Sequence, residues 1–253
     1  MRVLLLLLLG VVAATAASTR IIGGSNVEIS QYPYVAALLY SRTGSGTFYQ
    51  TCGGILITNR CILSVAHCSF GHPPTKWRAR VGSTRSSTGG RVYNFNRITT
   101  HPSFNAFTHD NDVALLHTGV NIAIGGNIQL AQIAGANYNV LDNSPVWSVG
   151  WGLVSWGGLP SDQLRHVQIW SVNLATCRQR YAGSGRNVTD NMMCSGWLDI
   201  GGRDSCTGDE GGPLVHNGVV VGMPSWAYMC GTARYPRVNT RISRFINWIL
   251  QNA

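Results

Sequence analysis

Charged residues are scarce in this chain of 253 residues: they make up 11% of it, and only ten are acidic. So few charges argue against long helices covered with ion pairs and favour a fold of many short strands. Low-complexity runs are missing and 45% of residues are hydrophobic, which excludes a disordered or fibrous chain. The basic residues are spread along the sequence, so the net charge of +9 does not indicate a nucleic-acid partner.

Lysine is almost absent, because Lys76 is the only lysine among 19 basic residues. Arginine keeps its charge above about pH 10, where lysine loses it. The excess of arginine is consistent with a strongly alkaline surrounding, and equally with the base composition of the gene. The sequence leaves both interpretations open.

The amino-terminal segment has the features of a secretory signal peptide. Arg2 precedes an apolar run over residues 4–9, and Ala14-Thr15-Ala16 fits a cleavage site. The run is too short to span a bilayer, and no later stretch is long enough, so we expect no membrane association. We predict that residues 1–17 are removed and that the protein is secreted, where its cysteines can form disulfides.

The remainder predicts an all-β protein with one terminal helix. Short apolar or alternating runs separated by Gly, Asn, Ser and Pro are typical of a sandwich or barrel. A helical stripe of apolar residues occurs only in the last segment, Ser243 to Leu250. The predicted strands include Tyr34 to Tyr40, Gly54 to Ile57, Pro145 to Val149 and Gly218 to Met223.

Five motifs occur in a fixed order along the chain. They are Ile21-Ile22-Gly23-Gly24, Ser64-Val65-Ala66-His67-Cys68, Asp110-Asn111-Asp112, Gly150-Trp151-Gly152 and Gly208-Asp209-Glu210-Gly211-Gly212-Pro213. Together they resemble the trypsin-like branch of the chymotrypsin family of serine proteases. The resemblance implies a peptidase domain over 21–253, made of two six-stranded antiparallel Greek-key barrels (about 21–130 and 131–253) and a C-terminal helix. The active site is then expected in the cleft between the barrels.

The resemblance assigns the catalytic positions. His67 matches the general base and Asp112 the carboxylate that orients it, although a lone histidine or aspartate is more often a packing or turn residue. The family pattern Gly-Asp-Ser-Gly-Gly-Pro places the nucleophilic serine where this chain has Glu210. The oxyanion hole corresponds to the backbone N–H groups of Gly208 and Glu210.

A glutamate in this place is expected to abolish peptidase activity. The mechanism needs an alcohol whose proton passes to the imidazole while its oxygen attacks a carbonyl group. A carboxylate has no such proton, and its charge opposes the developing oxyanion. We also predict that the carboxylate of Glu210 lies near His67 and raises the pKa of the imidazole; the alternative is that the side chain turns outward.

The specificity pocket also departs from the family. Asp204 matches the carboxylate that binds Arg and Lys side chains, and Ser225-Trp226 matches the strand beside the pocket. Ala227 and Arg237 stand where the family has glycines. The family has glycine at these positions because the wall of the pocket leaves little room for a side chain. We expect Arg237 to enter the pocket and pair with Asp204; the alternative is that it extends into solvent.

The resemblance also predicts how the chain is matured and cross-linked. Residues 18–20 form a short propeptide, cleavage after Arg20 frees the amino group of Ile21, and Asp209 receives that group; a loop arginine is the alternative for Arg20. One cysteine, Cys61, has no partner and is expected to be buried, with an intermolecular disulfide as the alternative. The implied disulfides are Cys52–Cys68, Cys177–Cys194 and Cys206–Cys230.

The sequence also bears on a metal site and on a glycosylation site. The stretch matching the family's calcium loop, residues 77–91, contains no acidic residue, so we expect no metal, and no motif indicates a cofactor. Asn187-Val188-Thr189 is a sequon for N-glycosylation.

The resulting hypothesis is a secreted trypsin-fold homologue without peptidase activity. We expect a monomer that binds protein partners, namely active proteases, inhibitors or protein substrates, as a decoy, cofactor or regulator. One alternative is an active trypsin-like endopeptidase that cleaves after Arg or Lys in digestion or processing. Another is a cationic protein that binds acidic surfaces independently of the cleft.

Overall fold

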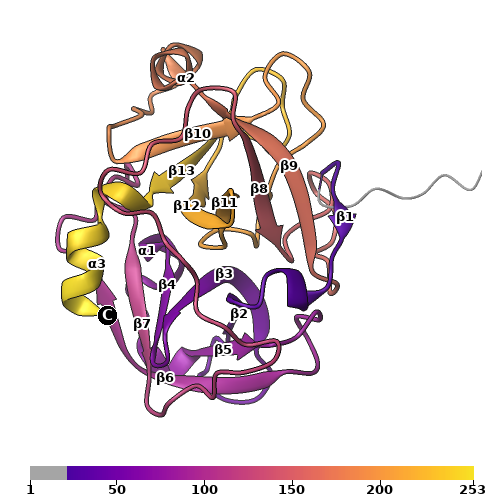
Figure 1. Ribbon diagram of the computed structural model, residues 1–253, viewed down its shortest axis with the longest axis vertical. Helices are drawn as coiled ribbons and strands as arrows, with labels where there is room; N and C mark the ends of the chain where they lie inside the picture. The colour runs from indigo at the N-terminus through magenta and orange to yellow at the C-terminus, as the bar shows by residue number, and fades with distance from the viewer. Residues whose placement is uncertain (1–21) are drawn as a thin grey trace, which may run out of the picture.

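Two closed β-barrels form the molecule, as the sequence predicts (Figure 1). The structure, a computed structural model, describes residues 22–253; the expected signal peptide, Arg20 and Ile21 lie outside this range. The amino-terminal barrel runs in the order β2 (Val35–Tyr40), β3 (Tyr49–Thr58), β4 (Cys61–Ser64), β7 (Ala114–Thr118), β6 (Arg91–Thr100) and β5 (Trp77–Val81), and β5 pairs with β2 to close it.

The carboxy-terminal barrel also has six antiparallel strands. It contains β8 (Pro145–Gly150), β9 (Arg165–Val172), β10 (Met192–Gly196), β13 (Arg237–Arg241), β12 (Val219–Trp226) and β11 (Leu214–His216). Pairing of β8 with both β9 and β11 closes this barrel, and the short strand β1 (Ser25–Asn26) extends it beside β9.

One apolar core spans both barrels. Ile55 and Leu115 of the first barrel pack in the same cluster as Val146, Ile169 and Val221 of the second. The four runs that the sequence predicts as strands correspond to β2, β3, β8 and β12. Strands β3 and β12 extend beyond the predicted runs. Burial of this shared core fixes how the two barrels face each other and therefore where their loops meet.

Three short α-helices complete the fold: α1 (Ala66–Ser69), α2 (Leu174–Tyr181) and α3 (Ile246–Asn252). The predicted terminal helix is divided into the 3₁₀ turn η3 (Ile242–Arg244) and α3, which lies beside the amino-terminal barrel in Figure 1. Two other 3₁₀ turns are η1 (Ile29–Gln31) and η2 (Pro74–Lys76). Within residues 22–253 no helix has the length and apolar character needed to cross a membrane.

Helix α2 was not predicted, because its apolar face is short and consists of Leu174, Cys177 and Tyr181 within a polar segment. Its amino terminus is capped by the side chain of Asn173, which accepts hydrogen bonds from the N–H groups of Ala175 and Thr176. The disulfide between Cys177 and Cys194 ties the helix to β10. The cap and the cross-link thus add to the packing of a short apolar face.

All three implied disulfides are present, since Cys52–Cys68 and Cys206–Cys230 also form. Cys61 is free and buried, as expected. Burial raises the pKa of its thiol to about 12, although Arg97 acts in the opposite direction.

The loop after β5 is held by a guanidinium group. Arg80 donates hydrogen bonds to the carbonyl oxygens of Ser86 (2.9 Å), Ser87 (3.0 Å) and Gly89. This loop lies in the stretch that matches the family's calcium loop. Asp162 of the second barrel accepts further hydrogen bonds from Ser86 and Ser87, so the loop is fixed from both sides.

Candidate functional site: an altered protease cleft

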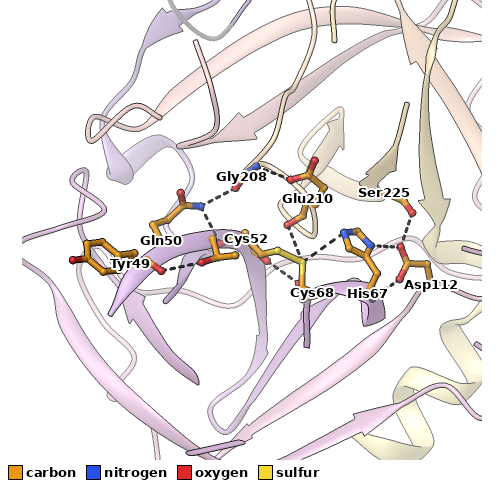
Figure 2. Close-up of a disulfide and its surroundings, with 12 residues drawn as sticks. Tyr49, Gln50, Cys52, His67, Cys68, Asp112, Gly208, Glu210 and Ser225 are labelled. Atoms are coloured by element: carbon orange, nitrogen blue, oxygen red, sulfur yellow. Dashed lines mark hydrogen bonds and ion pairs between the residues drawn. A yellow bond between two sulfur atoms is a disulfide. The ribbon is translucent and has the colours of Figure 1, made fainter. Parts of the chain in front are cut away.

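His67 and Asp112 meet between the barrels (Figure 2). His67 lies in α1, directly after buried β4, and its Nδ1 is 2.7 Å from Oδ2 of Asp112. The backbone N–H of His67 donates to the other carboxylate oxygen at 2.8 Å. Ser225 Oγ donates to Oδ2 of Asp112 at 2.5 Å, so this buried carboxylate is fully hydrogen-bonded.

The charges of this pair stabilise each other. Burial alone opposes ionisation of Asp112, but hydrogen bonds from His67 and Ser225 and the charge of His67 lower its pKa below the usual range. Burial of His67 lowers the pKa of its imidazole, but the hydrogen bond and charge of Asp112, and then the charge of Glu210, outweigh it and raise that pKa. The direction agrees with the prediction, and Asp112 is the main cause.

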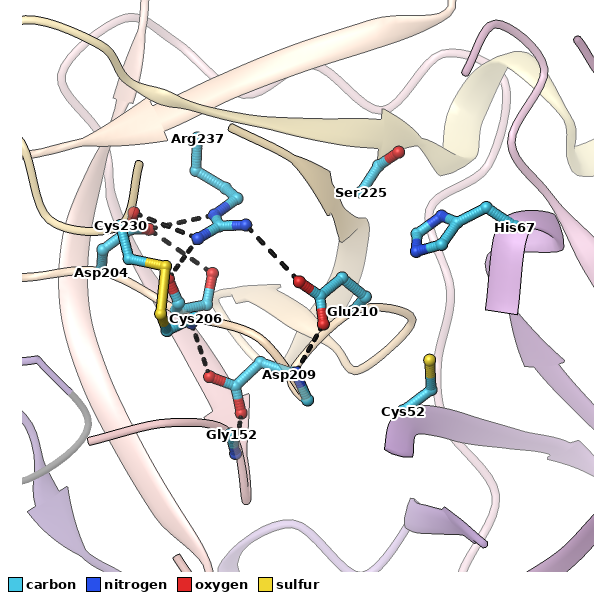
Figure 3. A network of polar contacts seen from close by, with 12 residues as sticks. Cys52, His67, Gly152, Asp204, Cys206, Asp209, Glu210, Ser225, Cys230 and Arg237 are labelled. Atoms are coloured by element: carbon cyan, nitrogen blue, oxygen red, sulfur yellow. Dashed lines mark hydrogen bonds and ion pairs between the residues drawn. A yellow bond between two sulfur atoms is a disulfide. The ribbon is translucent and has the colours of Figure 1, made fainter. Parts of the chain in front are cut away.

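Glu210 does not contact His67 in the way predicted. Its carboxylate turns toward the specificity pocket rather than toward the imidazole or into solvent (Figure 3). Oε2 accepts the N–H of Gly208 at 2.6 Å, and Oε1 lies 3.9 Å from Nη1 of Arg237. The physical reason is that the pocket offers a backbone donor and a buried cation on one side of the loop.

The consequence concerns the expected oxyanion hole. The N–H of Gly208, one of its two donors, is already bonded to the side chain of Glu210. A negatively charged oxygen from the chain itself therefore occupies a donor that a tetrahedral intermediate needs.

Arg237 fills the specificity pocket, and the interpretation that it extends into solvent is wrong. The side chain is 3% exposed, and its Nε lies 3.3 Å from Oδ1 of Asp204. Nη2 donates to the carbonyl oxygen of Ser205 at 2.5 Å, while the N–H of Gly231 donates to Asp204. Burial lowers the pKa of Arg237, but Asp204 and Glu210 outweigh this effect and raise it, so the guanidinium stays charged.

The remaining hollow of the cleft is lined by both barrels. His67 and His109 contribute one side, and Trp226, Ala227, Glu210 and Arg237 contribute the other. Asn187 is exposed on the loop that follows α2. Its role as a glycosylation site stays a prediction.

Asp209, which directly precedes Glu210 in the chain, is completely buried. Its two carboxylate oxygens accept the N–H groups of Gly152 (2.7 Å) and Cys206 (2.9 Å). A Cβ atom at position 152 would lie 2.6 Å from the carboxyl carbon, which explains the glycine in Gly150-Trp151-Gly152. Burial raises the pKa of Asp209 to about 7. The predicted partner, the amino group of Ile21, lies outside the described residues.

His109 is the residue that the sequence analysis missed. Its ring stacks on that of His67, with centroids 4.9 Å apart and planes 4° from parallel. The backbone of His109 is left-handed, with φ of 56°, which bends the chain just before Asp112 and directs the ring into the cleft. Its position three residues before Asp112 was the only available indication.

Comparisons with known proteins agree with this architecture. The family model described as Trypsin matches residues 21–249. The chain is 58% identical to "Trypsin, alkaline B" of Manduca sexta, over 96% of this chain and 94% of that protein. It is 52% identical to "Trypsin CFT-1" of Choristoneura fumiferana over the full length of both, and 46% identical to "Achelase-1" of Lonomia achelous over 92% of this chain and all of that protein.

The two-barrel fold and the His67–Asp112 pair define a chymotrypsin-like scaffold. With the family match and these identities, the chain belongs to the trypsin family of serine proteases.

Proposed function

We propose that this trypsin-family protein does not hydrolyse peptide bonds and acts by binding other proteins, as a decoy, cofactor or regulator of active proteases. The observation that carries the proposal is the position of Glu210. Its carboxylate stands in place of the nucleophilic serine, accepts the N–H of Gly208 and faces Arg237.

Loss of the nucleophile removes the first step of the mechanism. His67 and Asp112 keep the geometry of a general base and its orienting carboxylate, but no hydroxyl group lies at position 210 to be deprotonated. Removing this nucleophile alone costs on the order of 10⁶ in kcat. Turnover of a peptide amide would then be close to background.

The pocket supports the same conclusion. A substrate arginine would have to compete with Arg237 for Asp204, because the guanidinium of Arg237 is already buried against that carboxylate. At about 4 Å and an effective dielectric constant of about 20, such an attraction amounts to about 4 kcal/mol before desolvation.

The second candidate is an active trypsin-like endopeptidase that cleaves after Arg or Lys. The names of the relatives favour it, since several are trypsins at more than 50% identity, and the His67–Asp112 pair is intact. The word "alkaline" in the name of the Manduca sexta relative also matches the alkaline interpretation of the arginine excess. For this candidate, catalysis would have to proceed without a hydroxyl group at position 210.

The proposal includes secretion and proteolytic maturation. Three disulfides are typical of an oxidising, extracellular compartment. Residues 1–17 would be removed as a signal peptide and 18–20 as a propeptide, and the buried carboxylate of Asp209 would then receive the amino group of Ile21.

The test compares the wild-type chain, cleaved after Arg20, with a variant that carries both Glu210→Ser and Arg237→Gly and is expected to hydrolyse arginyl amides. The wild type should not hydrolyse arginyl amides above background and should not be labelled by an organophosphonate that reacts with active serines. Recovery of the mature protein from its native fluid with its bound proteins then identifies the partner. Stoichiometric labelling or turnover by the wild type would establish the endopeptidase instead.

A further inference from the structure

Two histidine rings and a buried carboxylate meet in the cleft. One ligand atom each of His67, His109 and Asp112 lies within 4.8 Å of the others. We propose that the two imidazoles bind a divalent transition-metal ion of the zinc type, with Asp112 as the outer partner of His67. The proposal does not depend on whether Glu210 abolishes catalysis.

His67 is already oriented as a metal ligand. Its Nδ1 is bonded to Asp112, so Nε2 is the nitrogen left for a ligand, with Sγ of Cys68 3.9 Å away from it (Figure 2). A carboxylate on the far nitrogen fixes the tautomer and strengthens the ring as a donor, which is the usual arrangement around zinc-bound histidines. Ser225 and the backbone of His67 hold that carboxylate in place.

His109 has a nitrogen that nothing else uses. Its Nδ1 is buried and has no hydrogen-bond partner among residues 22–253. The N–H of His109 donates to the carbonyl oxygen of Asn105 at 2.8 Å, and the neighbouring Asp110 accepts hydrogen bonds from Thr189 and Asn191. The backbone that presents this ring is therefore anchored to both barrels, and an unsatisfied polar atom in such a position calls for a ligand.

Binding requires a large rotation of one ring. Zinc lies in the plane of each ligating ring at about 2.0–2.1 Å from the nitrogen. Because the two planes are within 4° of parallel, one ring must tilt for a single ion to lie in both. His109 is the ring that moves, since its side chain makes no hydrogen bond among the described residues, whereas His67 is held by Asp112.

The donor set selects the ion. Imidazole nitrogens suit zinc and copper, whereas calcium and magnesium prefer sets of oxygen ligands. An ion with two protein ligands keeps at least two open coordination positions, whereas a catalytic zinc site has three protein ligands and keeps one. A carboxylate or imidazole of a partner protein could occupy such a position, so the cleft would bind that partner in a metal-dependent way.

The experiment is calorimetric titration of the full chain, without a histidine tag, with Zn²⁺. We expect one ion per chain, and no binding of Ca²⁺ or Mg²⁺ at the same concentrations. His109→Asn should lower the Zn²⁺ affinity at least about tenfold, because asparagine tolerates the left-handed backbone but lacks the imidazole. Asp112→Asn should lower it by roughly 10–100-fold through the outer shell. The matched control is His72→Asn, which changes an exposed histidine outside the cleft and should leave the affinity unchanged.

The ring resonances of the two histidines provide the second measurement. Zn²⁺ should shift or broaden the NMR signals of His67 and His109 together and spare those of His72. Unchanged affinity in His109→Asn, or a loss of equal size in His72→Asn, would overturn the proposal. If His109→Asn does not fold, as judged from its unfolding transition, joint perturbation of the two wild-type rings decides the question alone.

Discussion

The two sides of the cleft differ in how much of a protease they retain. On the side of the amino-terminal barrel, His67 and Asp112 have their full set of hydrogen bonds. On the side of the carboxy-terminal barrel, Glu210 accepts the N–H of Gly208 and Arg237 is buried against Asp204, the two contacts on which our proposal of an inactive cleft rests.

The His67–Asp112 pair has structural contacts of its own, apart from any catalytic role. Asp112 accepts a hydrogen bond from Ser225 through its side chain and one from Thr240 through its backbone oxygen, and both donors belong to the other barrel. The carboxylate therefore also joins the barrels. This structural role does not depend on which residue stands at position 210.

On the side of the carboxy-terminal barrel, the charges of Arg237, Asp204 and Glu210 partly compensate one another. The buried cation of Arg237 lies between Asp204 and the carboxylate of Glu210 (Figure 3). A charge placed at either position alone would be costly to bury, whereas the two together partly compensate each other. The two departures from the family are therefore best treated as one unit.

Restoring both residues gives the largest expected effect. Glu210→Ser alone should give little hydrolysis of arginyl amides, because Arg237 still occupies Asp204. Adding Arg237→Gly should raise kcat/KM by a further factor of about ten or more, since about 1.4 kcal/mol corresponds to tenfold. Steady-state kinetics on the mature chains measures this, with Glu210→Gln as the inactive control. Equal activity of the single and double variants would show that Arg237 does not limit substrate binding.

Removing the pocket carboxylate should give the next largest effect. Asp204→Asn leaves the 3% exposed guanidinium of Arg237 without its main partner, so unfolding in urea should show a loss of about 3 kcal/mol. Arg85→Ala is the control, because it breaks an ion pair with Asp162 whose side chains are 61% and 38% exposed. That change should cost less than about 1 kcal/mol. Similar losses in the two variants would contradict the role assigned to burial.

The pKa of His67 measures how much Asp112, on one side of the cleft, and Glu210, on the other, each stabilise the protonated imidazole. Its pKa should lie above about 6.5, Asp112→Asn should lower it strongly, and Glu210→Gln should lower it less. A raised folded-state pKa adds stability below the unfolded value, and this stability is lost as pH rises through the folded pKa. An NMR titration of the ring gives all three values. A larger drop in Glu210→Gln than in Asp112→Asn would reverse the assignment.

The smallest effect is expected at Cys61, inside the retained barrel. Because its thiol is buried and its pKa is raised to about 12, a thiol reagent should modify it only after unfolding. Cys61→Ala should cost about 1 kcal/mol. Rapid labelling of the native chain, measured by absorbance, would show that the thiol is accessible.

The sequence was sufficient to predict the fold class and the positions of the site residues along the chain. Five motifs carry a resemblance to a known family, and that resemblance implied the barrels, the disulfides and the place of Asp112. The direction of Glu210 could not be predicted, because it depends on Gly208 and on Arg237 from a distant strand. His109 was missed because its stacking depends on a left-handed backbone that a single histidine does not reveal.

The guanidinium of Arg80 has a consequence for the loop that follows β5. It donates to three carbonyl oxygens, those of Ser86, Ser87 and Gly89. The cation that holds this loop is therefore a side chain of the same polypeptide. A cation bonded covalently to the chain cannot be extracted by a chelator or diluted out of its site. A chelator is therefore expected to leave these three hydrogen bonds, and the loop conformation that they hold, unchanged.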